Sequence, residues 1–249
     1  MNSLNISIFT LNLYKPYTKY DKFMKPTIWC LPFAGASYYS YRPLFKSLEN
    51  TTHVNYLELP GRGNRVDEPL CLKYQEMLDD LYDQIAPKVT EPFILFGHSM
   101  GAQLAYDVTC LLDIRAGLKP DKLVVSGRGA PSSVEIKRRH DLPKNEFKQE
   151  LKQLGGVPNE IIADEEFFSF FEPILRADFQ AIEDYVYSVH KVLNVPILAL
   201  LGDNEETTEK QSRSWKQYTN NRFHLQIYKG GHFFLFDHVE EILKLIERF

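Results

Sequence analysis

Six short segments of this chain are rich in β-branched or aromatic residues, several of them apolar at nearly every position, and longer segments with helical periodicity separate them. A strand that is apolar throughout is typical of a sheet covered by helices on both faces, because neither face meets water. The order of the segments therefore predicts an α/β domain with a mostly parallel sheet. The expected strands are Ile28–Leu31, His53–Leu59, Phe93–Gly97, Leu123–Ser126, Ile197–Leu201 and Leu225–Tyr228. The expected helices are Tyr74–Val89, Met100–Ala116, Thr208–Tyr218 and Val239–Phe249.

One connection, from Ser126 to Ile197, is far longer than a strand-to-helix loop requires. Within it, Glu146–Leu154 and Glu165–Ala177 have the apolar spacing of helices, and the second segment is rich in phenylalanine. We expect a helical lid insertion over approximately residues 131–190, above the carboxyl edge of the sheet and over an apolar pocket. The alternative is that these phenylalanines pack on the main core.

Composition limits the class of protein. The 249 residues are 44% hydrophobic and 25% charged, as in globular proteins, and a net charge of −4 argues against nucleic-acid binding. No apolar run reaches the roughly 18–20 residues of a membrane span, and the N-terminal stretch lacks a signal-peptide pattern. Cys30, Cys71 and Cys110 form neither a closed disulfide set nor a metal-ligand spacing. We therefore expect a cytoplasmic protein with no membrane contact and no metal or organic cofactor.

The segment Gly97–Gly101 reads Gly-His-Ser-Met-Gly and stands between an expected strand and an expected helix. This G-x-S-x-G pattern is typical of a sharp turn that presents a serine hydroxyl as a nucleophile. Side chains at Gly97 and Gly101 would collide with the neighbouring strand and helix, which explains both glycines. We expect Ser99 to be the nucleophile, in strained backbone geometry at the positive end of the helix.

A serine nucleophile needs a base, and the chain order on such sheets is serine, then acid, then histidine. His232 follows the last expected strand and two glycines, at the sheet edge where catalytic loops collect, so we expect it to be the base. His98 adjoins the nucleophile, but its backbone position predicts a side chain that points away. The remaining histidines are expected outside the site: His53, His140, His190, His224 and His238.

The acid is expected just after the strand Ile197–Leu201, where Asp203 and Glu205 compete. Either carboxylate could orient the imidazole and stabilise its charged form. An oxyanion hole needs two backbone N–H groups. We expect one from Met100, directly after the nucleophile, and one from Ala34 in the loop after the first strand, with Phe33 as the alternative.

Together these motifs resemble the type II thioesterases that accompany non-ribosomal peptide and polyketide synthases. The resemblance runs from about Pro26 to the C-terminus and leaves residues 1–24 as an extension of unknown role. It rests on Cys30–Ser37, Tyr41–Leu44, Glu58–Gly63 with Arg65, Gly97–Gly101, Leu154–Gly156 with Pro158, Leu175–Phe179 with Tyr185, and Gly230–Phe234.

The resemblance implies an α/β-hydrolase fold over residues 25–249 with a helical lid. It also implies hydrolysis of acyl thioesters held on the phosphopantetheine arm of acyl or peptidyl carrier domains, which clears misprimed or stalled groups. By position, the family nucleophile falls on Ser99 and its base on His232. The family acid usually stands three residues after the glycine as aspartate. That place holds Glu205, which we favour over Asp203.

Other functions fit the same residues. The triad would serve a small-ester or lipid hydrolase equally well, and a chain-terminating thioesterase of fatty-acid synthesis shares these motifs. A third possibility is a non-catalytic partner protein with a degenerate site, but the presence of both Ser99 and His232 argues against it. The basic run Lys137–Arg139 could dock the acidic surface of a carrier protein or simply be a solvated face.

Overall fold

The computed structural model describes residues 26–49, 52–89, 92–133, 137–186 and 191–249. The N-terminal extension proposed for residues 1–24 and the candidate His190 lie outside these residues. The strands are β1 (Thr27–Leu31), β2 (Val54–Tyr56), β3 (Phe93–His98), β4 (Lys122–Ser126), β5 (Ile197–Gly202) and β6 (Phe223–Tyr228). The helices are α1 (Arg42–Phe45), α2 (Tyr74–Ile85), α3 (Met100–Ala116), α4 (Lys144–Leu154), α5 (Asn159–Ala163), α6 (Glu165–Glu183), α7 (Glu209–Arg213) and α8 (Val239–Arg248).

Within the described residues, the strands form one sheet in the order β2-β1-β3-β4-β5-β6, and every pairing is parallel. Parallel pairing places all carboxyl ends at one edge, next to the N-termini of the helices that follow. The expectation of a mostly parallel sheet is thus confirmed.

Alternate residues of the inner strands face two separate cores, which explains why strands such as β1, β3 and β5 are buried at every position. Trp29 and Leu31 of β1 pack with α2 and α3 on one face of the sheet. Ile28 and Cys30 pack with α1 and α8 on the other face. Both faces are therefore shielded from water by helices, as the unbroken apolar runs predict.

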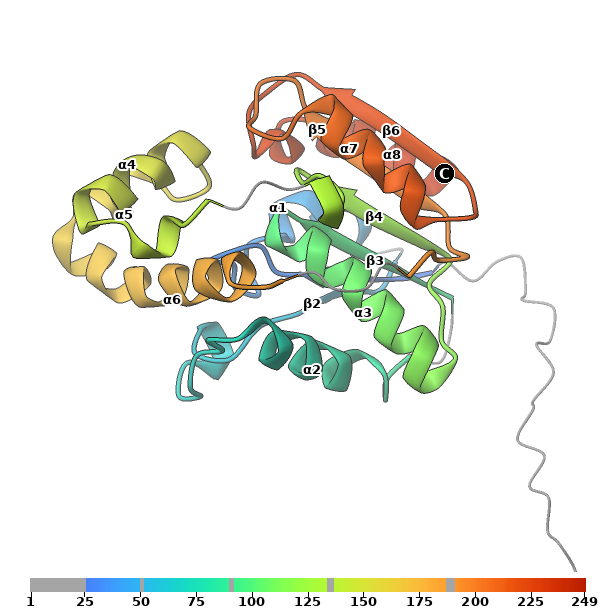
Figure 1. Ribbon diagram of the computed structural model, residues 1–249, viewed down its shortest axis with the longest axis horizontal. Coiled ribbons are helices and arrows are strands. Elements are labelled where there is room, and N and C mark those ends of the chain that lie inside the picture. Colours follow the sequence, from blue (N-terminus) through green and yellow to red (C-terminus); the bar gives the residue numbers. More distant parts are fainter. Residues whose placement is uncertain (1–25, 50–51, 90–91, 134–136, 187–190) are drawn as a thin grey trace, which may run out of the picture.

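The helical insertion stands beyond the carboxyl edge of the sheet, where α4, α5 and α6 form a group of their own (Figure 1). Its phenylalanines were expected either to cover an apolar pocket or to pack on the main core, and neither holds for all of them. Phe147 and Phe168 are fully buried, but in a cluster of the insertion's own and not in the main core. Phe171 joins that cluster and lines a cavity, whereas Phe167 and Phe170 are exposed.

Several element boundaries differ from those expected. The strand expected over His53–Leu59 pairs only over Val54–Tyr56, because it lies at the sheet edge and the chain turns away before Pro60. The helix expected over Thr208–Tyr218 is α-helical only to Arg213 and continues as a 3₁₀ helix. By contrast, α3 has the expected bounds and ends at Gly117, whose left-handed φ of 66° closes the helix.

Candidate active site

Ser99 stands in the sharp turn between β3 and α3, as expected. Its φ is 54°, the one positive φ among the described residues other than glycine. Its backbone N–H donates to the Ser126 carbonyl at the end of β4, 2.8 Å away. A side chain held in this left-handed region is strained, and such strain gathers at functional turns.

The two glycines of the turn are required by close backbone contacts, which confirms the expected collisions. A Cβ at Gly97 would lie 1.9 Å from the carbonyl oxygen of Gly101, in the first turn of α3. A Cβ at Gly101 would lie 2.4 Å from the Leu31 carbonyl oxygen at the end of β1. The helix therefore starts directly against the sheet, with Ser99 at the bend.

His232 and Glu205 meet across two loops at the carboxyl ends of β5 and β6. His232 Nδ1 is 2.8 Å from Glu205 Oε2, while the other oxygen of Glu205 accepts the Gly202 N–H at 2.8 Å. The Glu205 side chain is 1% exposed and that of His232 is 14% exposed. A carboxylate on Nδ1 fixes the imidazole and leaves Nε2 for another partner.

Asp203, the competing acid, faces a different group. Its side chain accepts the Gly230 N–H at 2.9 Å, and its own N–H donates to the Tyr228 carbonyl. Asp203 is exposed, and it fixes the start of the loop that carries His232. Of the two candidates, Glu205 therefore contacts the imidazole and Asp203 holds the loop.

His98 contacts His232, which the sequence did not indicate. The His98 ring is fully buried, and Nδ1 is 3.0 Å from Ser126 Oγ. The two imidazole centroids are 4.7 Å apart. Burial, and then the neighbouring His232, lower the pKa of His98 well below its usual value. A neutral His98 supports the His232 ring without repelling a positive charge that forms on it.

The loop after β1, where the second oxyanion donor is expected, lies on the wall of a cavity. Phe33, Ala34, Ser99 and Met100 all line one cavity, so both alternatives for the second donor share that cavity with the serine. The next residue, Gly35, donates its N–H to Asp178 Oδ2 of α6 at 2.7 Å. This contact holds the loop from the side of the insertion.

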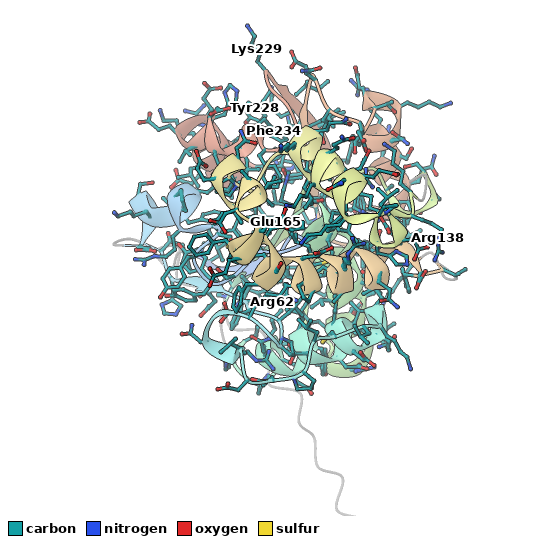
Figure 2. All side chains as sticks on the ribbon, turned by 90° about the vertical axis from the view of Figure 1, so that its left-hand side faces the viewer. Arg62, Arg138, Glu165, Tyr228, Lys229 and Phe234 are labelled. Atoms are coloured by element: carbon teal, nitrogen blue, oxygen red, sulfur yellow. The ribbon has the colours of Figure 1, made fainter. Side chains whose placement is uncertain are left out.

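Asp178 is also the centre of a buried ion pair. Both of its oxygens accept from the guanidinium of Arg62, which follows β2, and the two side chains are 0% and 3% exposed. In Figure 2, which looks onto the insertion, Arg62 lies next to α6. Both residues lie in segments that carry the family resemblance, Glu58–Gly63 and Leu175–Phe179, but the 116 positions between them hide the pairing.

A cavity of about 1000 Å³ lies between the carboxyl edge of the sheet and the insertion. Its size is at the upper end for ligand-binding pockets. Ser99, Glu205 and His232 lie on its wall together with the oxyanion loop. The insertion contributes mainly apolar groups: Leu151, Leu154, Val157, Ile161, Phe171, Leu175, Phe179 and Ile182.

The basic run Lys137–Arg139 is neutralised within the chain. Lys137 and Arg139 both pair with Glu206 of the β5–α7 loop, and Arg139 also pairs with Glu150. Arg138, labelled in Figure 2, pairs with Asp141 and Asp184. Cations paired in this way have less attraction for an acidic partner than a free basic patch.

The other described histidines lie outside the Ser99 site. His140 bonds Glu183 at 2.7 Å, His53 is exposed, and His224 packs near Phe249. His238 precedes α8 and bonds the Lys229 carbonyl. Among the described residues, no helix is both long and apolar enough to cross a membrane.

The parallel sheet, the strained serine turn and the insertion define the class of α/β-hydrolase thioesterases. The family model described as "Thioesterase domain" matches residues 26–249. The chain belongs to this family, in its type II branch.

Named relatives agree with this assignment. The gramicidin S biosynthesis protein GrsT of Aneurinibacillus migulanus is 33% identical, over 89% of this chain and 88% of its own. Thioesterase PikA5 of Streptomyces venezuelae is 33% identical, over 86% and 76%. Among solved structures, the type II thioesterase BorB of the borrelidin cluster has a TM-score of 0.81 and 34% identity. That match covers 90% of this chain and 91% of BorB.

Proposed function

We propose that this enzyme hydrolyses acyl thioesters held on the phosphopantetheine arm of acyl or peptidyl carrier domains. It would thereby clear misprimed or stalled groups from non-ribosomal peptide or polyketide synthases. The support is the contact between His232 and Glu205, on the wall of a largely apolar cavity that also holds Ser99. Two relatives of this chain, GrsT and BorB, are named as proteins of gramicidin S and borrelidin biosynthesis.

In the proposed mechanism, Ser99 Oγ attacks the thioester carbonyl carbon while His232 Nε2 takes the hydroxyl proton. The oxyanion accepts hydrogen bonds from the N–H groups of Met100 and Ala34. The C–S bond then breaks, and His232 protonates the leaving thiol. Water, deprotonated by His232, attacks the acyl-serine, and the carboxylic acid and free Ser99 are released. Glu205 stabilises the imidazolium in both steps.

The insertion supplies the acyl pocket in this proposal. Residues 25–249 would form the thioesterase domain, and residues of approximately 131–190 would cover the cavity with apolar side chains such as Leu151 and Phe171. A carrier-bound substrate places the enzyme in the cytoplasm. The absence of a disulfide among the described cysteines is compatible with that compartment.

The test is release of acyl groups from loaded carrier domains by the wild type and by Ser99→Ala. We expect Ser99→Ala to abolish release and fluorophosphonate labelling while keeping the melting temperature. The matched control is Ser214→Ala, because that hydroxyl donates an exposed hydrogen bond to the Lys210 carbonyl. If Ser99→Ala keeps most of the turnover, the nucleophile is assigned wrongly. A clear preference of the wild type for p-nitrophenyl esters would favour a small-ester hydrolase instead.

A further inference from the structure

Arg128 is a cation on the cavity wall that the proposed mechanism does not use. It follows Gly127 at the carboxyl end of β4, two residues after Ser126, whose carbonyl holds the Ser99 N–H. Within the described part of the chain, its guanidinium forms no hydrogen bond or ion pair, and its buried Nε is without a partner. Arg128 as a whole is half-buried, and its guanidinium is charged at any physiological pH, so a position with a buried Nε and no bonded counter-ion is costly.

The backbone around Arg128 is held firmly. Its carbonyl accepts the Trp215 indole N–H at 2.9 Å. A Cβ at Gly127 would lie 2.4 Å from the His98 ring and 3.2 Å from the His232 ring. A Cβ at Gly129 would lie 2.8 Å from Gln211 Cβ. Arg128 is therefore presented to the cavity from a fixed position beside the histidines.

The acidic groups near Arg128 bond other partners. Asp107 of α3 accepts from Tyr74 of α2 and Gln103, and burial raises its pKa to about 6. Glu183 at the end of α6 accepts from the backbone N–H of Arg139 and from His140. Burial lowers the pKa of Arg128, the nearby Tyr74, Asp107 and Glu183 act in the opposite direction, and Arg139 adds to the lowering. The charge of Arg128 is thus left without a direct counter-ion from the neighbouring elements.

We propose that Arg128 binds an anionic oxygen group of the substrate inside the cavity, which deepens and rests on the proposed thioesterase function. An arginine recognises a carboxylate or a phosphate through paired N–H donors. The group would be either a carboxylate at the end of the acyl chain or the phosphate of the phosphopantetheine arm. Both have the same chemistry, and model substrates separate them.

The experiment uses two pairs of thioesters. Succinyl- and butyryl-N-acetylcysteamine differ only by a terminal carboxylate in place of a methyl group. Butyryl-phosphopantetheine and butyryl-pantetheine differ only by the phosphate. The kcat/KM of each is measured for the wild type, Arg128→Met and Arg128→Lys. The control is Arg213→Gln, which removes an exposed arginine paired with Glu209.

We expect Arg128→Met to lower the anionic-to-neutral ratio of kcat/KM by roughly 10–100 fold in one of the two pairs. The pair that responds identifies the anion, and Arg128→Lys restores part of the ratio. An equal loss on all four substrates, or no change in either ratio, would overturn the proposal. Arg128→Lys tests the same ratios if Arg128→Met does not fold. If the wild type hydrolyses neither the four thioesters nor any loaded carrier domain, the proposed function itself is wrong.

Discussion

At the scale of single residues, the decisive feature is that two carboxylates on one short loop point to different targets. Glu205 bonds the His232 imidazole, and Asp203 bonds the Gly230 backbone. We predict that Glu205→Gln lowers kcat for thioester hydrolysis on the order of 10³–10⁴ fold, because a neutral amide no longer stabilises the imidazolium or fixes its tautomer. Steady-state rates on a single thioester measure this.

The matched control is Asp203→Asn, which keeps an oxygen to accept the Gly230 N–H and removes the charge. We expect it to leave kcat almost unchanged and to alter mainly the melting temperature. Should Asp203→Asn reduce kcat more than Glu205→Gln, the roles of the two acids are reversed.

Residues with a local signal could be predicted from the sequence, and those without one could not. Ser99 is indicated by its two glycines and the flanking strand and helix, and His232 by its place after the last strand. The choice between Asp203 and Glu205 depends on the direction of each side chain along a turn, which no periodicity encodes, so Glu205 could be favoured only through its position in the family pattern. Arg128 stands in no recognisable motif. It is singled out only because the acidic groups near it bond other residues, and those bonds cannot be read from the sequence.

At the scale of elements, α6 is joined to the main domain by the buried pair of Asp178 and Arg62. We predict that Asp178→Ala costs about 3–5 kcal/mol in the free energy of unfolding, because Arg62 would stay buried without its counter-charge. It should also slow labelling of Ser99 by a fluorophosphonate, since the Gly35 N–H loses its acceptor beside the oxyanion loop. Denaturant titration and labelling kinetics measure the two effects.

An exposed ion pair provides the control for this prediction. Glu209 and Arg213 of α7 are 50% and 60% exposed, so Glu209→Gln should cost less than about 1 kcal/mol. A similarly small cost for Asp178→Ala would mean that α6 is attached by its apolar contacts alone.

The long elements could be predicted well, whereas the short ones were missed. The helix α3 has the expected bounds, because the serine turn marks its start and Gly117 its end. The helices α1 and α5 have only four and five residues, too few for a period to be visible. The edge strand β2 was predicted too long, because the buried Leu57 and Leu59 belong to the core although the strand itself ends at Tyr56.

At the scale of the whole molecule, folding is coupled to the protonation of Asp107. Burial raises the pKa of Asp107 from 3.8 to about 6, so the folded state holds this proton more tightly than the unfolded chain. The bound proton contributes about 3 kcal/mol to the free energy of unfolding below pH 3.8. This contribution is lost as the pH rises through 6.

Comparison of the wild type with Asp107→Asn isolates this effect, because the amide does not titrate. We expect the wild type to lose about 1–2 kcal/mol of stability relative to the variant between pH 5 and pH 7.5. Urea titrations at both pH values measure the difference. Parallel pH profiles of the two proteins would show that Asp107 titrates normally.

The double attachment of Asp178 has a consequence for how such an enzyme can diversify. In the proposed function, α6 lines the acyl pocket and is also bonded through Asp178 to the loop expected to hold the oxyanion, so acyl preference and turnover would be coupled through α6. Substitutions there are expected to change both properties at once. New chain-length preferences without a loss of rate should instead arise on α4 and α5, where uncharged aliphatic groups such as Leu151 and Ile161 line the cavity.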